Sequence, residues 1–324
     1  MTALGRRIAT LIAVQGPISV AEFMAMALHD PQGGYYATHD PFGAAGDFIT
    51  APEISQVFGE SLGLWCAQVW HDQGKPKRKR LVELGPGRGT LMNDALRAMK
   101  VAPEFLDGLE VVLVEASPAL TGIQKELLQD NGVEIRWLER FDPSLGDRPL
   151  FLLANEFFDA LPIRQYVKTA RGWCERVVTV DAVGVLTFAL APIPVPDSLV
   201  PTNRAGAPEG AVYEVSSASS SLTEEIAGVI AHRGGGALFV DYGYDKGGFG
   251  ETLQAVTDHS FTGVLNDPGD SDLSAHVDFL ALAAAAEQGG AAAFGPTTQA
   301  DFLKDLGAAQ RIDHLAARDR RAHV

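Results

Sequence analysis

The stretch Leu81-Val82-Glu83-Leu84-Gly85-Pro86-Gly87-Arg88-Gly89-Thr90 decides the fold of this chain. Its first half is a short apolar run typical of a buried strand, and its second half is a glycine-rich turn that opens a helical stretch. Because glycine has no Cβ, such a turn allows a ligand to approach the backbone closely. The pattern therefore predicts a strand, a helix, and between them a ligand-binding turn with Gly85, Gly87 and Gly89.

The turn lacks the signatures of the common phosphate-binding loops. Thr90 stands where a dinucleotide fingerprint needs a third glycine, and the Gly-Lys-Ser/Thr ending of a P-loop is absent. The turn therefore suits a ligand without a pyrophosphate.

Carboxylates accompany this turn on two neighbouring strands. Glu115 ends the apolar run Val111-Val112-Leu113-Val114, where a carboxylate can accept hydrogen bonds from the two hydroxyls of a ribose. It follows Gly87 by about 28 residues, whereas the dinucleotide pattern expects about 20, which disfavours an NAD-linked oxidoreductase. Glu83 lies inside the first strand, and we expect it to accept hydrogen bonds from loop amides or from a ligand's ammonium group.

Apolar runs alternate with helical stretches around this centre, as they do in a mostly parallel sheet that is covered by helices. Helices are predicted near residues 91–100 and 120–130. The predicted fold class is α/β with a doubly wound, Rossmann-like sheet. Its strands are expected at residues 81–84, 109–115, 133–138, 150–154 and 237–241.

The expected core at residues 78–324 is preceded by one further region and interrupted by another. Residues 1–75 read as a mainly helical segment, in which Thr50-Ala51-Pro52-Glu53 fits a capping box. After Pro162, short alternating runs separated by turns predict an antiparallel, β-rich insertion at about residues 163–212.

A polar, acidic loop follows the fourth strand at residues 155–162, at the edge where open α/β sheets bind ligands. Glu156 and Asp159 supply two carboxylates that can orient a guanidinium in fork geometry, with Asn155 beside them. The Asn-Glu-Phe-Phe order is only weakly similar to the Asn-Pro-Pro-aromatic loop of the amino-group methyltransferases that act on nucleobases or glutamine, since both prolines are missing. An alternative is that the loop is a strand-to-helix cap with two core aromatics.

Composition limits the partners of the chain. Its 324 residues carry a formal net charge of −15, which disfavours binding to a nucleic-acid backbone. The basic run at residues 75–80 reads as a solvated connector before the first core strand. Residues 182–196 form the longest uncharged stretch, too short to cross a bilayer, and two distant cysteines indicate free thiols in a reducing cytoplasm.

The separated motifs of this chain resemble one known family. The Glu-x-Gly-x-Gly strand end with an acid one strand later is similar to the first two motifs of class I methyltransferases. Further blocks resemble the MidA-like methyltransferases, whose mitochondrial members methylate arginine on a NuoD-type subunit and assist assembly of respiratory complex I. These blocks lie at residues 33–36, 46–60, 83–89, 155–162, 241–244, 272–279 and 295–299.

The resemblance implies a Rossmann-like methyltransferase that uses S-adenosylmethionine and acts on a protein client. It implies that residues 46–60 cover the cofactor, which makes Asp47, Thr50 and Glu53 candidates for the pocket together with Glu83, Gly85, Gly87, Gly89 and Glu115. Glu156, Asp159 and Asn155 become the catalytic candidates.

No metal is expected, because Asp272, His276 and Asp278 near a helix start are more often caps than ligands. Family members continue to a closing Met-Gly-x-Leu-Phe-Lys-like segment that this sequence does not contain, so the terminal strand of the sheet is expected to be missing. A non-catalytic assembly factor that binds the same cofactor is the alternative function, and the oligomeric state stays open.

Overall fold

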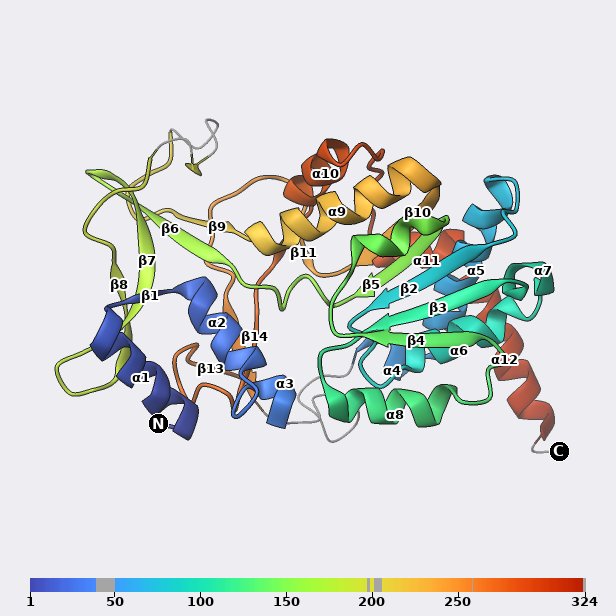
Figure 1. Cartoon of the computed structure of the whole chain (residues 1–324), viewed down its shortest axis with the longest axis horizontal. Helices are drawn as coiled ribbons and strands as arrows, with labels where there is room; N and C mark the ends of the chain where they lie inside the picture. The colour runs from blue at the N-terminus through green and yellow to red at the C-terminus, as the bar shows by residue number, and fades with distance from the viewer. Residues whose placement is uncertain (39–49, 197–198, 201–205, 258, 323–324) are drawn as a thin grey trace.

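The structure is a computed structural model that describes residues 1–38, 50–196, 199–200, 206–257 and 259–322 (Figure 1). Two lobes lie side by side. The lobe on the right of Figure 1 holds a parallel sheet, and the lobe on the left holds antiparallel strands and the N-terminal helices. Asp47 lies outside the described residues.

The core sheet has the order β10-β5-β2-β3-β4, and every neighbouring pair is parallel. Because the chain moves outward from β2 to β4 and then returns beside β2, the order reverses between β2 and β5, where doubly wound sheets bind ligands. All five predicted core strands are confirmed. They are β2 (Lys79–Leu84), β3 (Leu109–Val114), β4 (Glu134–Leu138), β5 (Leu150–Asn155) and β10 (Gly235–Val240).

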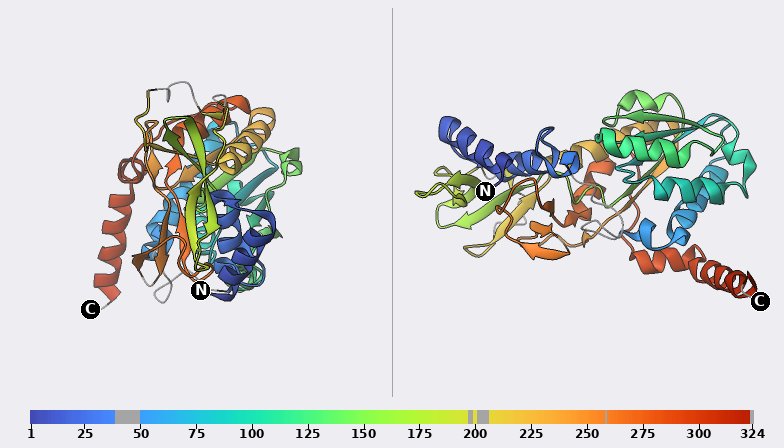
Figure 2. Two further views of the ribbon diagram at one scale, coloured as in Figure 1. Left: turned by 90° about the vertical axis from the view of Figure 1, so that its left-hand side faces the viewer. Right: turned by 90° about the horizontal axis from the view of Figure 1, so that it is seen from below.

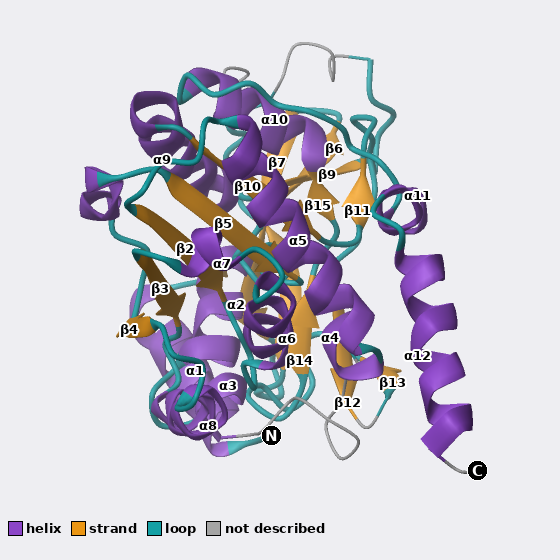
Figure 3. Ribbon diagram, turned by 90° about the vertical axis from the view of Figure 1, so that its right-hand side faces the viewer, coloured by secondary structure: helices purple, strands orange, loops and turns teal. Residues whose placement is uncertain are grey.

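Helices cover both faces of this sheet, which explains why its strands are continuously apolar. Alternate strand residues such as Leu81 and Val111 face α5 (Gln56–Asp72) and α6 (Thr90–Met99). The intervening residues, such as Val82 and Val112, face α9 (Ser217–Arg233) and α10 (Phe279–Gln288). Figure 3 shows α9 on one side of the strands and α5 with α6 on the other. The predicted doubly wound fold is confirmed.

The predicted helices after β2 and β3 are present as α6 and as α8 (Pro118–Leu128). Both helices begin slightly earlier in the sequence than the apolar periodicity indicated. The N-cap of α6 is Gly89, which has a left-handed backbone conformation, and the N-cap of α8 is Ser117. Short turns of helix at α7 (Pro103–Leu106) and η1 (Pro143–Asp147) complete the connections.

The β-rich insertion forms the second lobe and is antiparallel. It continues to Val215, beyond the expected end at about residue 212, because its last strand pairs with its first. Its strands are β6 (Arg164–Thr169), β7 (Gly172–Val180), β8 (Leu186–Leu190) and β9 (Val212–Val215), joined by β1 (Ile18–Ser19).

Short strands from the last third of the chain lie beneath this lobe in Figure 1 or link it to the core. One sheet has the order β13-β12-β14, and β11 pairs in parallel with β15. Their bounds are β11 (Gly243–Tyr244), β12 (Gln254–Thr257), β13 (Ser260–Thr262), β14 (Asp272–Ser274) and β15 (Val277–Asp278).

Residues 1–75, expected as one helical cover for the cofactor, divide between the two lobes. The helices α1 (Ala3–Gln15) and α2 (Val20–His29) bury Ile8 and Phe23 against Val178 of the β lobe. By contrast, α5 belongs to the core, where Gly63 lets it approach α6 so closely that a Cβ there would lie 2.7 Å from the Cα of Ala95. Sequence periodicity shows that a helix has an apolar face but not which surface covers it.

The capping box predicted at Thr50 and Glu53 does not form. The Thr50 side chain makes no capping hydrogen bond, and α4 (Ala51–Ile54) ends after one turn. Ser55 is extended, and its hydroxyl accepts from the Val57 amide at 3.2 Å to begin α5. A second cap inside the predicted helix therefore splits it in two. The remaining helices are α3 (Tyr35–Thr38), α11 (Gln299–Asp305) and α12 (Ala308–Ala322), the last of which extends away from the body (Figure 2).

The sequence predicted that the basic run at residues 75–80 is a solvated connector, but the structure shows that part of it is buried. Lys79 and Arg80 belong to β2 and are buried. The Lys79 ammonium donates to the carbonyl oxygens of Glu104 and Asp107 and lies over the Trp70 ring. A buried cation is tolerated because its donors are satisfied.

Arg80 ion-pairs with Glu110 at 2.6 Å, and Arg136 and Arg148 contact the same carboxylate at 2.8 and 3.0 Å. Burial by itself would raise the pKa of Glu110, but the hydrogen bonds from Arg136 and Arg80 lower it below its ordinary value of 4.5. A depressed pKa means that this carboxylate stabilises the fold above about pH 4.5 and that the stabilisation is lost as the pH falls.

Glu110→Gln should therefore destabilise the protein at pH 7 by about 3 kcal/mol, since it leaves the buried Arg80 with only the half-exposed Asp147 as a counter-charge. The difference from the wild type should shrink as the pH falls below the ordinary carboxyl pKa. Urea unfolding at pH 7 and pH 4 measures this, with the exposed Glu126→Gln on α8 as the matched control. Equal stability of Glu110→Gln and Glu126→Gln at pH 7 would contradict the prediction.

Candidate active site

The glycine turn after β2 lies at the carboxyl edge of the core sheet. Gly85, Gly87 and Gly89 all have positive φ, at 58°, 53° and 86°. The Gly85 amide donates to the carbonyl of Val114 at 3.0 Å, and the Gly87 carbonyl accepts from the Gln124 side chain at 2.7 Å. These two hydrogen bonds therefore fix the turn to β3 and to α8.

The acidic loop, defined as residues 155–162, begins at the end of β5 beside this turn. Glu156 has a φ of 47°, a left-handed conformation that costs a non-glycine residue roughly 1–2 kcal/mol. Phe157 packs so closely against the turn that a Cβ on Gly85 would lie 2.8 Å from its ring. The two loops are therefore in contact, and Gly85 is required for that contact.

A cavity between these loops and α4 brings together seven of the residues singled out in the sequence. They are Thr50, Glu53, Glu83, Gly85, Gly87, Asn155 and Glu156, and the other lining residues are Pro52, Pro86, Arg88, Thr90 and Leu91. Gly89, Glu115 and Asp159 do not line the cavity.

Two polar atoms in this cavity are buried and have no hydrogen-bond partner within the described part of the chain. They are Glu83 Oε2 and Asn155 Oδ1. Burial, together with the charge of Glu115 nearby, raises the pKa of Glu83 to about 8. Because orphaned buried acceptors are costly, the cavity is built for a ligand that carries hydrogen-bond donors.

Glu115 follows β3 directly and is connected to the glycine turn through Gln124. One Glu115 oxygen accepts from the Ser117 amide at 2.7 Å, and the other accepts from the Gln124 amide group at 3.1 Å. Burial raises the pKa of Glu115, and these hydrogen bonds oppose that effect. Gln124 was not found from the sequence, because an amide inside a helix carries no motif.

Asp159 is buried and points away from the cavity. Its Oδ2 accepts from the Tyr242 hydroxyl at 2.5 Å, and its carbonyl accepts from the Ala275 amide at 2.9 Å. Burial raises the pKa of Asp159. This placement is that of an anchor for the loop, whereas Glu156 and Asn155 face the cavity.

The Glu156 carboxyl is held at the start of α4. Burial and the charge of Asp159 raise its pKa, while hydrogen bonds from the Ala51 amide and the Asn155 side chain lower it. Glu156 thus occupies the place at the α4 start that the Thr50 hydroxyl was expected to fill.

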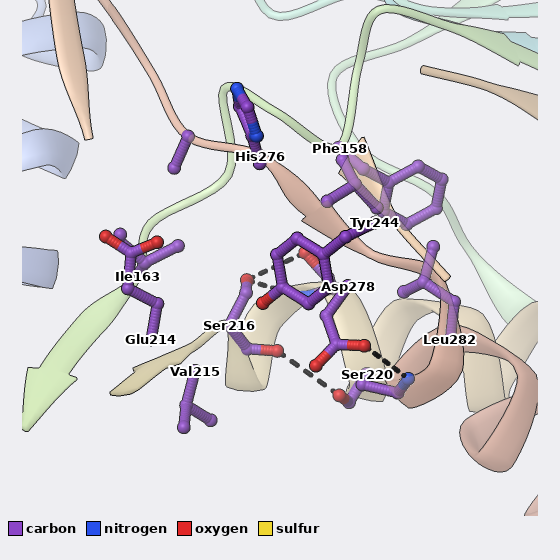
Figure 4. A pocket seen from close by; sticks show the side chains of 14 residues that line it. Phe158, Ile163, Glu214, Val215, Ser216, Ser220, Tyr244, His276, Asp278 and Leu282 are labelled. Atoms are coloured by element: carbon purple, nitrogen blue, oxygen red, sulfur yellow. Dashed lines mark hydrogen bonds between the residues drawn. The ribbon is translucent and has the colours of Figure 1, made fainter. Parts of the chain in front are cut away.

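A second pocket lies on the far side of Phe158, between the starts of α9 and α10 (Figure 4). There, the Asp278 carboxylate accepts from the Ala281 amide and caps α10. The ring of His276 lies apart from that carboxylate and packs edge-on against Tyr242. Among the described residues, no cluster of three or more His, Cys, Asp or Glu side chains could hold a metal ion.

Comparison with known proteins identifies the family of the chain. Residues 61–297 match the family model described as "Putative S-adenosyl-L-methionine-dependent methyltransferase". The chain belongs to this methyltransferase family.

Named relatives and a solved structure extend over almost the whole methyltransferase chain. Protein arginine methyltransferase NDUFAF7 of Danio rerio is 39% identical over 334 residues, which cover 96% of this chain and 78% of the relative. The human protein is also 39% identical and covers 97% and 76% of the two chains. A Burkholderia thailandensis crystal structure with bound S-adenosyl-homocysteine has a TM-score of 0.84 and 30% identity, and the match covers 98% of this chain and 84% of that one.

The methyl donor of the family fits the cavity residues. S-adenosylmethionine carries an ammonium group, which can donate to the orphaned Glu83 carboxylate, and it lacks a pyrophosphate, as the turn without a third glycine had suggested. Family membership thereby decides against the NAD-linked oxidoreductase.

The relatives also correct the prediction of a cytoplasmic protein, because they are named as mitochondrial. Cys66 and Cys174 are free and buried. Free thiols indicate reducing surroundings but do not distinguish one reducing compartment from another. No helix in the described ranges is long and apolar enough to span a membrane.

The raised pKa of Glu83 gives the methyltransferase a measurable trade-off. Its neutral form stabilises the fold fully below its ordinary pKa of 4.5, and this stabilisation is lost as the pH rises through about 8. Glu83→Gln cannot ionise, so at pH 8 it should melt no lower than the wild type while it binds S-adenosyl-homocysteine at least tenfold more weakly. Melting scans and calorimetry test this, and an unchanged affinity would remove Glu83 from the binding site.

Proposed function

We propose that this methyltransferase transfers the methyl group of S-adenosylmethionine to an arginine of a protein client, a NuoD-type subunit of respiratory complex I, and thereby supports complex I assembly. The observation that carries the proposal is the carboxylate of Glu156 in the cavity beside the glycine turn. The relatives named as protein arginine methyltransferases support it.

Glu83, Gly85, Gly87 and Glu115 would hold the donor, with Thr50 and Glu53 over it. When bound, S-adenosylmethionine supplies an electrophilic methyl group on a positive sulfonium. The protein then has to orient the nucleophile and exclude water. The positive φ values at Gly85 and Gly87 and the absence of a Cβ there let the donor approach the backbone of the turn closely.

Glu156 would orient the guanidinium. A carboxylate in fork geometry receives two N–H groups and localises the positive charge there, so that the third nitrogen presents its lone pair. Asn155 places its unpartnered Oδ1 in the same cavity and can accept a further N–H from the client. Asp159 would act on the reaction through the loop that it anchors.

Lining charges favour such a cationic client. Glu53, Glu83 and Glu156 line the cavity, whereas Arg88 is the one cation among the described lining residues. With a formal net charge of −15 on the whole chain, we expect no preference for nucleic acid.

Glu156→Gln keeps the volume of the side chain and removes its charge. We expect the affinity for S-adenosyl-homocysteine to persist while methyl transfer to an arginine peptide falls roughly a hundredfold or more. The exposed Glu126→Gln is the control. If Glu156 only caps α4, the variant should instead lose melting temperature and activity together.

A test of the client uses mass spectrometry of complex I from the source organism, with and without this gene. A methylated arginine on the NuoD-type subunit should disappear when the gene is removed. A complex that fails to assemble although the arginine was never methylated would favour the non-catalytic assembly factor.

A further inference from the structure

The dipeptide Asp241-Tyr242 follows β10 and makes hydrogen bonds to residues 157–159 of the acidic loop. Neither residue lines the cavity between the glycine turn and the acidic loop. They lie in the block 241–244 that resembles the family, but no binding or catalytic role has been given to them above, yet they contact the loop that carries Glu156.

Asp241 receives three consecutive backbone amides of the acidic loop on one carboxylate oxygen. Its Oδ2 accepts from the amides of Phe157, Phe158 and Asp159 at 3.2, 3.0 and 3.3 Å. Its Oδ1 accepts from the Tyr242 amide at 2.9 Å. Because three successive amides converge on one oxygen, this carboxyl group defines the curvature of the loop directly after Glu156.

The residues on either side of Asp241 complete the hold. The carbonyl of Val240 accepts from the Glu156 amide at 2.8 Å. The Tyr242 hydroxyl donates to Asp159, and the Tyr242 carbonyl accepts from the Val277 amide at 3.0 Å. Val240 at the end of β10 and the next two residues, Asp241 and Tyr242, therefore hold the loop from Glu156 to Asp159.

We infer that Asp241 and Tyr242 are positioning residues, which touch neither donor nor client. They keep Glu156 in its left-handed conformation, so that its carboxylate faces the reacting nitrogen. This inference rests on the proposed function for its catalytic consequence, and on the hydrogen bonds alone for its structural part. A displacement of about 1 Å at a reacting centre costs on the order of a hundredfold in rate.

The negative charge of ionised Asp241 does not stabilise the fold. Burial and the neighbouring Asp159 raise the pKa of Asp241 to about 8, so its ionised form works against folding as the pH rises through that value. The groups that face it are Asp159 and Tyr242, together with the three loop amides. Removing the charge should therefore leave stability equal or higher, which separates a positioning role from a structural one.

Asp241→Asn is the decisive variant. Asparagine has the same shape, but its oxygen is a weaker acceptor and its NH₂ group opposes the Tyr242 amide. We expect exchange of the Phe157, Phe158 and Asp159 amides to accelerate at least tenfold, with the β5 amides unchanged. The kcat for methyl transfer should fall about tenfold or more, while the client KM and the affinity for S-adenosyl-homocysteine stay within about twofold.

Two further variants sharpen the test. The exposed Asp245→Asn is the matched control and should behave as the wild type. Asp241→Asn combined with Glu156→Gln should be no slower than Glu156→Gln alone, since a residue that acts through Glu156 has nothing left to position. Tyr242→Phe removes the hydroxyl with its hydrogen bonds to Asp159 and Ser274 but leaves Asp241 in place, so it should cause a smaller loss of kcat.

Three outcomes would overturn the inference: unchanged exchange at residues 157–159, unchanged kcat, or a kcat that falls in step with melting temperature and cofactor affinity. Failure of the proposed function has a different signature. In that case the wild type transfers no methyl group to arginine peptides, while the exchange measurement still decides whether Asp241 holds the loop.

Discussion

Burial of carboxylates at the carboxyl edge of the core sheet is the constraint on which the site depends. Glu83, Glu115, Glu156, Asp159 and Asp241 all have pKa values raised, mainly by burial. Each ionised carboxylate in such a place needs donors, and backbone amides or the Tyr242 hydroxyl supply them to all but Glu83. Finding those donors is what brings the ends of β5 and β10 and the start of α4 together.

Opposite ends of the same two strands show opposite uses of charge. At the amino end, Arg80 of β2 and Glu110 of β3 are fully paired, and the pKa of Glu110 is lowered. Toward the carboxyl end, Glu83 of β2 keeps an unpartnered oxygen among the described residues, and its pKa is raised to about 8. A paired carboxylate stabilises the fold, whereas an unpaired one costs stability, which is the usual trade-off at a site kept for ligand binding.

Local pattern was enough to predict the core strands, the glycine turn, the antiparallel insertion and the acidic loop, because burial on both faces leaves continuous apolar runs. It was not enough where distant segments decide the outcome. The docking of α1 and α2 on the β lobe, the burial of Lys79 and Arg80, and the replacement of the Thr50 cap by Glu156 all depend on partners far away in the sequence. Gln124 belonged to no motif, and the block 241–244 gave no role for Asp241, since the hydrogen bonds of both residues are to backbone atoms and side chains of other elements.

In the proposed reaction, charge in the cavity would affect product release as well as the choice of client. Three carboxylates and one arginine line it among the described residues, so cationic ligands are attracted and phosphates are repelled. A sulfonium donor and a guanidinium bring two positive charges into this acidic surrounding. Methyl transfer leaves a neutral thioether and a guanidinium that has released one proton to solvent, so one positive charge is lost. An acidic lining would therefore hold these reactants more strongly than the products, so the carboxylates that favour a cationic client would also favour the release of products after transfer.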